Sequence, residues 1–243
     1  MFRMSHAVAG GSALIALSVL PAQGQDLDPL MTQVLELSKT HSIDDWAYTQ
    51  NMNINAMGEA DVEIISRYDP SKPKDEQVEL ISITVNGDRE DEDSDDMDYS
   101  DMEIPSYSDL EDLIEGGVEL IKEDEKTATY RVFPSEDGHQ FDFGSLDIDT
   151  NDADENLMGE LVVQKGDTPY VSDVRFYLDK PYGSVWLAKV KELNFGYSFA
   201  PQGDGTILAD KFHLDLDLKT LLFVHVEVGI DTEFTDFTFV GSK

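Results

Sequence analysis

The last third of the chain, from Leu157 to Val240, alternates apolar and polar residues in short runs. Successive side chains of a β-strand point to opposite faces, so each run predicts one half-buried strand. Short polar breaks between the runs are typical of an antiparallel sheet with one apolar and one solvated face. The clearest runs are Val174/Phe176/Leu178, Trp186/Ala188/Val190, Phe212/Leu214/Leu216/Leu218 and Val224/Val226/Val228.

This final part of the sheet is predicted to be curved. In one strand the apolar positions are even-numbered up to Val190 and odd-numbered from Leu193. One extra residue near Lys191-Glu192 would restore the register, and this predicts a β-bulge there. Bulges bend strands, so long bulged strands favour a curved sheet. The six predicted strands span residues 157–164, 170–178, 184–199, 206–218, 221–230 and 233–240.

The first half of the chain predicts two helices and further strands. A helix at 25–40 begins at Asp28-Pro29 and has an apolar face. A second helix at 108–115 begins with a capping box of Ser108 and Glu111. Asn86-Gly87 predicts a tight turn. The first helix's apolar face is Leu27, Leu30, Met31, Val34 and Leu35, and the predicted strands are 45–57, 61–68, 78–85, 118–122 and 126–133. The fold class is therefore mainly β (α+β), with ten or eleven antiparallel strands covered by an N-terminal helix and short mid-chain helices.

The first 24 residues predict a cleaved signal peptide. Arg3 precedes an apolar run at 13–19 that is too short to span a membrane, and Ala22-Gln23-Gly24 supplies small residues for cleavage before Gln25. The alternative is a buried N-terminal helix. The chain contains no cysteine, so neither disulfides nor lipidation at the cleavage point are available. We expect one exported domain at 25–243, located in the periplasm of a Gram-negative cell and not membrane-spanning.

The balance of charges limits the possible partners. The chain has 51 acidic and 17 basic residues, which gives a formal net charge of −34 at pH 7. Nucleic-acid phosphates and anionic membrane surfaces would be repelled by such a protein. The simplest explanation of this charge is a solubilising surface.

An acidic segment at 88–103 has almost no apolar residue and predicts a mobile, solvated loop. Its spacing opens like a calcium-binding EF-hand loop. The pattern then fails, because Asp96 replaces the glycine at the sixth position and Met102 replaces the glutamate at the twelfth. We therefore expect no metal site, and the weak candidate ligands are Asp91, Asp93 and Asp95.

Histidines also occur in two alternating polar stretches, His213-x-Asp215-x-Asp217 and His225-x-Glu227. If their strands pair, these residues could meet and bind a metal. A solvated sheet face explains the same alternation and is the favoured interpretation. The sequence contains neither a Gly-x-Ser-x-Gly nucleophile motif nor a glycine-rich phosphate loop. We therefore expect no enzymatic activity and no cofactor.

Apolar residues of the strands have two interpretations. Large aromatic side chains usually dominate core packing, which is the simpler interpretation. The functional one is that a curved sheet exposes more apolar surface than short helices cover, leaving a lipid pocket. The candidate ligand-binding residues are Trp46, Tyr48, Ile64, Phe176, Trp186, Phe195, Phe212 and Leu214.

Several stretches taken together resemble the LolA-type periplasmic lipoprotein carriers and related lipoprotein-sorting proteins. They are the exported amphipathic helix, the strand with Trp46, Arg67-Tyr68-Asp69-Pro70 leading to Val78-Glu79-Leu80-Ile81 and Asn86-Gly87, the run Leu157 to Val163, the turn Phe176 to Pro181, and Phe195 to Phe199 followed by Gly203-Asp204-Gly205. The resemblance covers most of the chain after the signal peptide. It implies an incomplete barrel whose concave apolar face, covered by helices, accepts an acyl chain or a lipidated protein.

Two functions from different classes remain open. The first is a monomeric, non-enzymatic carrier that holds an apolar ligand on the concave face of a half-barrel. The second is an acidic structural or interaction module with a packed core, which binds a basic protein or divalent cations. How completely the helices fill the apolar face distinguishes them.

Overall fold

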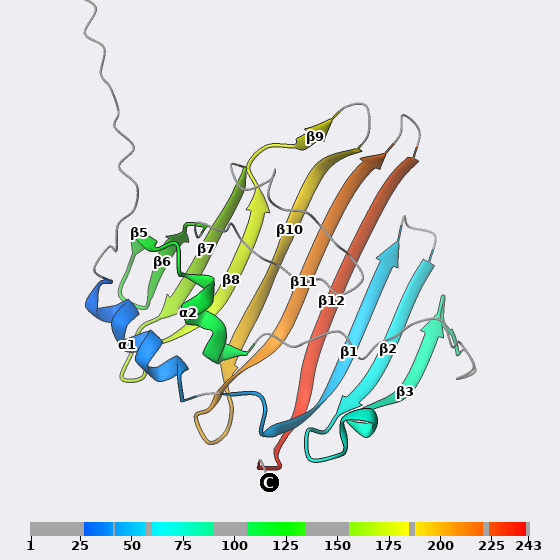
Figure 1. The fold of residues 1–243 in the computed structure, drawn as a ribbon, viewed down its shortest axis with the longest axis horizontal. Coiled ribbons are helices and arrows are strands. Elements are labelled where there is room, and N and C mark those ends of the chain that lie inside the picture. Colours follow the sequence, from blue (N-terminus) through cyan, green and yellow to red (C-terminus); the bar gives the residue numbers. More distant parts are fainter. Residues whose placement is uncertain are drawn as a thin grey trace, which may run out of the picture.

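The computed structural model describes residues 27–40, 42–56, 60–89, 106–134, 156–184, 188–220 and 224–241. In these residues the protein is mainly β, with one curved, unclosed antiparallel sheet and two short α-helices (Figure 1). The strand order is β4-β3-β2-β1-β12-β11-β10-β8-β7-β6-β5, and β9 pairs with β10. The strands are β1 Trp46–Ala56, β2 Ala60–Tyr68, β3 Val78–Val85, β4 Asp88–Arg89, β5 Val118–Glu123, β6 Thr127–Val132, β7 Leu157–Gln164, β8 Tyr170–Leu178, β9 Tyr182–Ser184, β10 Ala188–Pro201, β11 Ile207–Thr220 and β12 Val224–Phe239.

The mainly β class is confirmed, although the described sheet has twelve strands where ten or eleven were predicted. Two very short strands were not predicted, β4 with two residues and β9 with three, whereas the last two predicted strands form one. Alternation is readable only over about four residues or more. β4 also corrects the predicted acidic loop, because Asp88 and Arg89 pair with β3. Asn86 and Gly87 form the tight turn that was predicted, with φ angles of 50° and 86°.

Helix α1 (Pro29–Ser38) lies within the predicted range and begins as expected. Asp28 is its N-cap and Pro29 occupies the first turn, where a missing N–H costs nothing. Met31, Val34 and Leu35 are buried in the same core cluster as the strands. The amphipathic pattern therefore identified correctly which face of the helix packs on the sheet.

The second helix differs from its prediction. Helix α2 (Leu110–Leu113) follows a 3₁₀ turn, η3 (Tyr107–Asp109), and the capping side chain is Ser106. The predicted cap at Ser108 was wrong, because the chain already turns at Tyr107. Tyr107 is buried and its hydroxyl accepts a hydrogen bond from the Val171 N–H of β8 at 2.8 Å. This tertiary contact fixes where the segment begins to turn. A further 3₁₀ turn, η1 (Lys74–Glu76), connects β2 to β3.

The predicted bulge in β10 is confirmed. Val190 lies opposite Leu218 of β11, and Glu192 lies opposite Asp217, so Lys191 is the extra residue. The bulge returns the apolar side chains on either side of it to one face of the sheet.

Two separate strands were predicted at 221–230 and 233–240. This was wrong, because β12 is one continuous strand, Val224–Phe239. Thr232 is buried within it, although its polar neighbours look like a break. The irregularity lies further on, at Asp236, whose φ of 54° is left-handed. Pairing with β1 shifts register there, between Ala47 and Thr49. A bulge bends this strand without ending it.

The register places a continuous row of apolar residues across ten strands. Residues directly opposite each other on neighbouring strands share one face of the sheet. We call this set the apolar row, and from β5 to β3 it contains Val118, Val132, Gly159, Phe176, Phe195, Leu214, Ile230, Ile54, Val62 and Val85.

The adjacent positions on the opposite face form a second row, which we call the charged row. It contains Glu119, Arg131, Glu160, Arg175, Gly196, His213, Asp231, Asn53, Glu63 and Thr84. The expected division into one apolar and one polar face therefore extends over ten of the twelve described strands.

Several predicted features lie outside the described residues. They are the signal peptide at 1–24, residues 90–103 of the acidic loop with Asp91, Asp93 and Asp95, and Trp186.

Candidate ligand surface and polar face

Four of the predicted ligand-binding residues lie close together on the apolar face. Phe176 and Phe195 stack with ring centroids 5.2 Å apart, and Leu214 lies opposite Phe195. All three are essentially fully buried. Phe212 is half-buried, and its ring lies 5.1 Å from that of Tyr197. Burial raises the pKa of Tyr197 to about 12, so this phenol is neutral at physiological pH.

The other three described candidates lie toward the β1–β3 end of the sheet. Tyr48 packs against Tyr68 and Phe234, at centroid distances of 5.1 and 5.9 Å. Trp46 meets Phe239 edge-on at 5.4 Å. The remaining candidate, Ile64, is buried in register between Met52 and Ile83. These side chains form aromatic and aliphatic packing rather than a polar constellation.

Sequence reasoning missed several members of this surface. Tyr107, Tyr130 and Phe199 are buried in the same core cluster as Phe176. Phe234 and Phe237 also contact Tyr48. The apolar positions change from even-numbered at Phe234 to odd-numbered at Phe237, as they do around Lys191. The same change of phase could therefore have predicted the bulge at Asp236.

Burial changes along the apolar row. From Val118 to Leu214 every side chain with a Cβ is buried, whereas Ile230, Ile54, Val62 and Val85 are only half-buried. Figure 1 shows α1 and α2 in front of the β6–β8 side of the sheet. Among the described residues, helical cover and full burial thus coincide at one end of the row.

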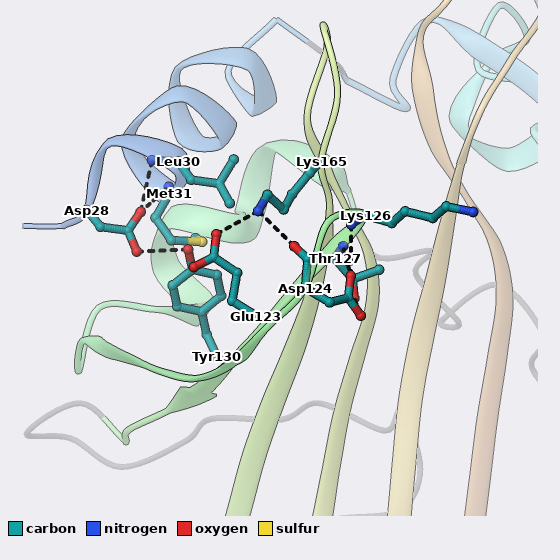
Figure 2. A network of polar contacts seen from close by, with 9 residues as sticks. All are labelled: Asp28, Leu30, Met31, Glu123, Asp124, Lys126, Thr127, Tyr130 and Lys165. Carbon is teal, nitrogen blue, oxygen red and sulfur yellow. Dashed lines mark hydrogen bonds and ion pairs between the residues drawn. The ribbon is translucent and has the colours of Figure 1, made fainter.

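A polar contact joins α1 to the sheet beneath it (Figure 2). One carboxylate oxygen of Asp28 accepts hydrogen bonds from the N–H groups of Leu30 and Met31 at 2.9 Å. The other accepts from the Tyr130 hydroxyl at 2.8 Å. Burial and the neighbouring Asp28 raise the pKa of Tyr130. The helix cap and the β6 strand therefore share one carboxylate.

The β5–β6 hairpin is fastened beside this contact, as Figure 2 also shows. Lys165 donates to Glu123 Oε1 at 2.6 Å and to the Asp124 carbonyl at 2.9 Å. Asp124 Oδ1 accepts from the Lys126 and Thr127 N–H groups at 2.8 Å, and these hydrogen bonds lower the pKa of Asp124. These hydrogen bonds hold the turn between β5 and β6, which indicates a structural role.

Two grooves lined by described residues lie on the polar face. The larger, of about 850 Å³, crosses β1, β2, β11 and β12, and the smaller, of about 460 Å³, lies around Gly196. The larger groove has seven acidic side chains in its lining and no basic one; they are Asp61, Glu63, Glu192, Asp215, Asp217, Glu227 and Asp231. The sequence had placed the acyl ligand on the apolar face and had assigned an acidic surface only to the alternative interaction module.

His213 bridges two strands on this polar face. Its Nδ1 lies 2.7 Å from Asp231 Oδ1, and its Nε2 lies 2.8 Å from Asp215 Oδ2. Partial burial acts to lower the pKa of His213, but the hydrogen bonds to Asp231 and Asp215 outweigh it and raise that pKa. Both ring nitrogens can donate only when the ring is protonated.

His225 forms a different cluster, on the same face. Its Nε2 lies 2.7 Å from Asp217 Oδ1, 3.3 Å from Glu227 Oε1 and 2.9 Å from Lys191 Nζ. Partial burial acts to raise the pKa of Asp217, but its hydrogen bonds with His225 and Lys191 lower it overall. The strand pairing that the metal hypothesis required is therefore present, because β11 and β12 pair.

Among the described residues, no helix is long and apolar enough to cross a lipid bilayer. The chain matches no protein-family model, no curated protein and no solved structure.

Proposed function

We propose that this protein binds an acyl chain, or a lipidated protein that presents one, on the apolar face of its sheet. It would act without chemistry, as the resemblance to LolA-type carriers implies, in the periplasm after cleavage near Gln25. The half-burial of Ile230, Ile54, Val62 and Val85 supports this proposal, because it leaves apolar surface beyond the described helical cover.

The physical basis is the removal of apolar surface from water. Each buried methylene contributes about 0.8 kcal/mol, so an acyl chain gains affinity with its length. An open, helix-covered sheet suits such a ligand because a chain can lie across several strands. Neutral phenols such as that of Tyr197 add no charge to this surface.

Native mass spectrometry and solvent extraction of protein purified from its own periplasm would test the proposal. We expect a bound lipid and displacement of a fluorescent fatty acid that is added as a probe. A protein with no bound lipid and no affinity for the probe would contradict it.

Adjacent residues of β1 provide a matched pair for the same assay. Ile54→Thr removes apolar surface from the half-buried end of the apolar row, and we expect threefold to tenfold weaker probe binding, from about one methylene equivalent or more. Asn53→Thr changes the opposite face and should leave probe binding unchanged. Thermal unfolding of both variants checks that the fold is retained.

A second candidate function is an acidic interaction module that binds a basic protein or divalent cations. The groove with seven acidic side chains favours it. Titration with a lysine-rich peptide at low and high salt would test this function. Salt-sensitive binding that Asp231→Asn and Glu63→Gln weaken would support it, and binding that neither substitution changes would exclude this groove.

A further inference from the structure

The pairing of β11 with β12 gathers three metal-ligating side chains at one point on the polar face. Asp217 and Glu227 lie directly opposite each other, and His225 is two residues from Glu227 on the same face. One ligand atom from each of the three lies within 4.8 Å of the other two. The set comes from two adjacent strands in a fixed register, so its geometry does not depend on a loop.

The hydrogen-bonding capacity of His225 does not match its surroundings. A single ring nitrogen offers either one proton or one lone pair. Here Nε2 of His225 faces two carboxylate oxygens and the ammonium group of Lys191 at 2.7 to 3.3 Å. It can donate to one carboxylate or accept from Lys191, but it cannot satisfy all three groups.

His213 shows that this mismatch is particular to His225. Each nitrogen of the His213 ring has its own carboxylate, so one proton on each nitrogen satisfies the whole arrangement. At His225, a cation that accepts one lone pair from nitrogen and others from both carboxylates would satisfy all of these groups. Lys191, which also lies 3.2 Å from Asp217, holds a positive charge at this point.

We propose that Asp217, His225 and Glu227 bind a divalent transition-metal ion of the Zn²⁺ class, in competition with the ammonium group of Lys191. Imidazole and carboxylate ligands suit Zn²⁺. Ligand atoms around a tetrahedral ion with bonds of about 2.0–2.1 Å lie about 3.3 Å apart. The separations of 2.7 and 3.3 Å from His225 Nε2 to the two carboxylates are close to this value, and all three ligand atoms lie within 4.8 Å of one another.

Access and coordination number are consistent with such an ion. Asp217 and Glu227 line the groove of about 850 Å³, which opens to solvent on the polar face. Three protein ligands leave a fourth position for water. The bulge at Lys191 places its side chain at this site, and a flexible lysine can move away when a metal enters.

Calorimetric titration of the full chain with Zn²⁺ tests the proposal, with Ca²⁺ as the comparison ion. We expect His225→Ala to weaken the tightest Zn²⁺ binding by about tenfold or more, since losing even an outer-shell partner costs about 10- to 100-fold. Lys191→Met should strengthen it, because the competing cation is removed. His213→Ala, on the same strand pair, is the matched control and should leave Zn²⁺ binding unchanged.

Imidazole resonances in NMR spectra give a second readout. Sub-stoichiometric Zn²⁺ should shift the signals of His225 before those of His213. Identical Zn²⁺ isotherms for wild type and His225→Ala would overturn the proposal, as would an equal loss in His213→Ala. Calcium that binds at this site more tightly than Zn²⁺ would also overturn it. The acyl-chain proposal concerns the other face, so neither result decides it.

Discussion

The apolar row and the charged row cross the same ten strands one residue apart, yet they are held in different ways. The apolar row is buried from Val118 to Leu214, with Phe176 and Phe195 stacked in this part, and half-buried beyond it. The charged row starts with acidic and basic side chains in alternation, through Glu119, Arg131 and Glu160. Close packing in the buried part of the apolar row excludes water, whereas the charge pairs of the other face are exposed and screened by solvent. We therefore expect the buried part of the apolar row to carry most of the stability and the charged row to contribute little to it.

The largest expected effect is at the centre of the apolar row. Phe195→Ala removes a fully buried ring and should lower the free energy of unfolding by about 3–5 kcal/mol. Its neighbour Asn194 points to the other face, where it accepts a hydrogen bond from Arg175. Asn194→Ala should cost less than about 1 kcal/mol, close to the usual value of one exposed hydrogen bond. Urea unfolding of both variants measures the difference; equal losses would contradict the comparison.

The next effect concerns the glycine of the apolar row. A Cβ on Gly159 would lie 2.7 Å from the Phe176 ring and 2.9 Å from Val132 Cβ. Gly159→Ala should therefore displace the Phe176 ring and cost about 1–3 kcal/mol, as overpacking does. The double variant Gly159→Ala with Phe176→Leu makes room for the methyl group. It should lose less stability than the two single losses added, and strict additivity in a thermodynamic cycle would show that the two residues do not interact.

A smaller effect is expected from pH at His213. Its folded pKa is raised above the ordinary value of about 6.5, so its stabilising contribution is complete below that value and is lost as the pH rises through the folded pKa. The surrounding charges are Asp215 and Lys211 on its own strand and Asp231 and Glu233 on β12.

NMR titration of the His213 ring provides the measurement, together with unfolding curves on both sides of neutral pH. As the pH rises through the folded pKa of His213, we expect the free energy of unfolding to fall less in His213→Gln than in the wild type. A ring that titrates at or below the ordinary histidine value would contradict the bridged arrangement.

The smallest effect is expected at the end of the charged row. Glu119 lies 3.8 Å from Arg131, and both side chains are exposed. Glu119→Gln should change the free energy of unfolding by less than about 0.5 kcal/mol, because solvent screens such pairs. The midpoint temperature of unfolding should differ little between wild type and Glu119→Gln, at low salt and at high salt alike. A loss of stability comparable with that of Gly159→Ala would mean that the charged row contributes to stability as the apolar row does.

Local pattern predicted much of this sheet because alternation reports directly on which side chains are buried. The strands at 157–164, 170–178 and 78–85 have the predicted bounds, and the bulge lies at Lys191. The continuity of β12 was missed because Thr232 is polar, and its burial depends on its partners Met52 and Phe212. The cap at Ser106 was missed because the contact of Tyr107 with Val171 is long-range.

The candidate sites were likewise predictable where local alternation indicates burial, and not where long-range contacts decide. Seven of the eight predicted ligand-binding residues lie in the described chain and are buried or half-buried, as their spacing indicated. The meeting of Asp217, His225 and Glu227 was predicted only on condition that their strands pair. The part played by Lys191 was not foreseeable, since it follows from where the bulge directs one side chain.

The position of β12 between β1 and β11 has a consequence for the order of folding. Among the described strands, β1 to β4 join the rest of the sheet only through β12, which is synthesised last of them. During synthesis, β1 is therefore made well before β12, with which it pairs in the finished sheet. Such non-local closure is slow, and it leaves apolar strands exposed to aggregation in the meantime. Pulsed hydrogen exchange during refolding should show β1 protected together with β12 and later than the β7–β8 hairpin.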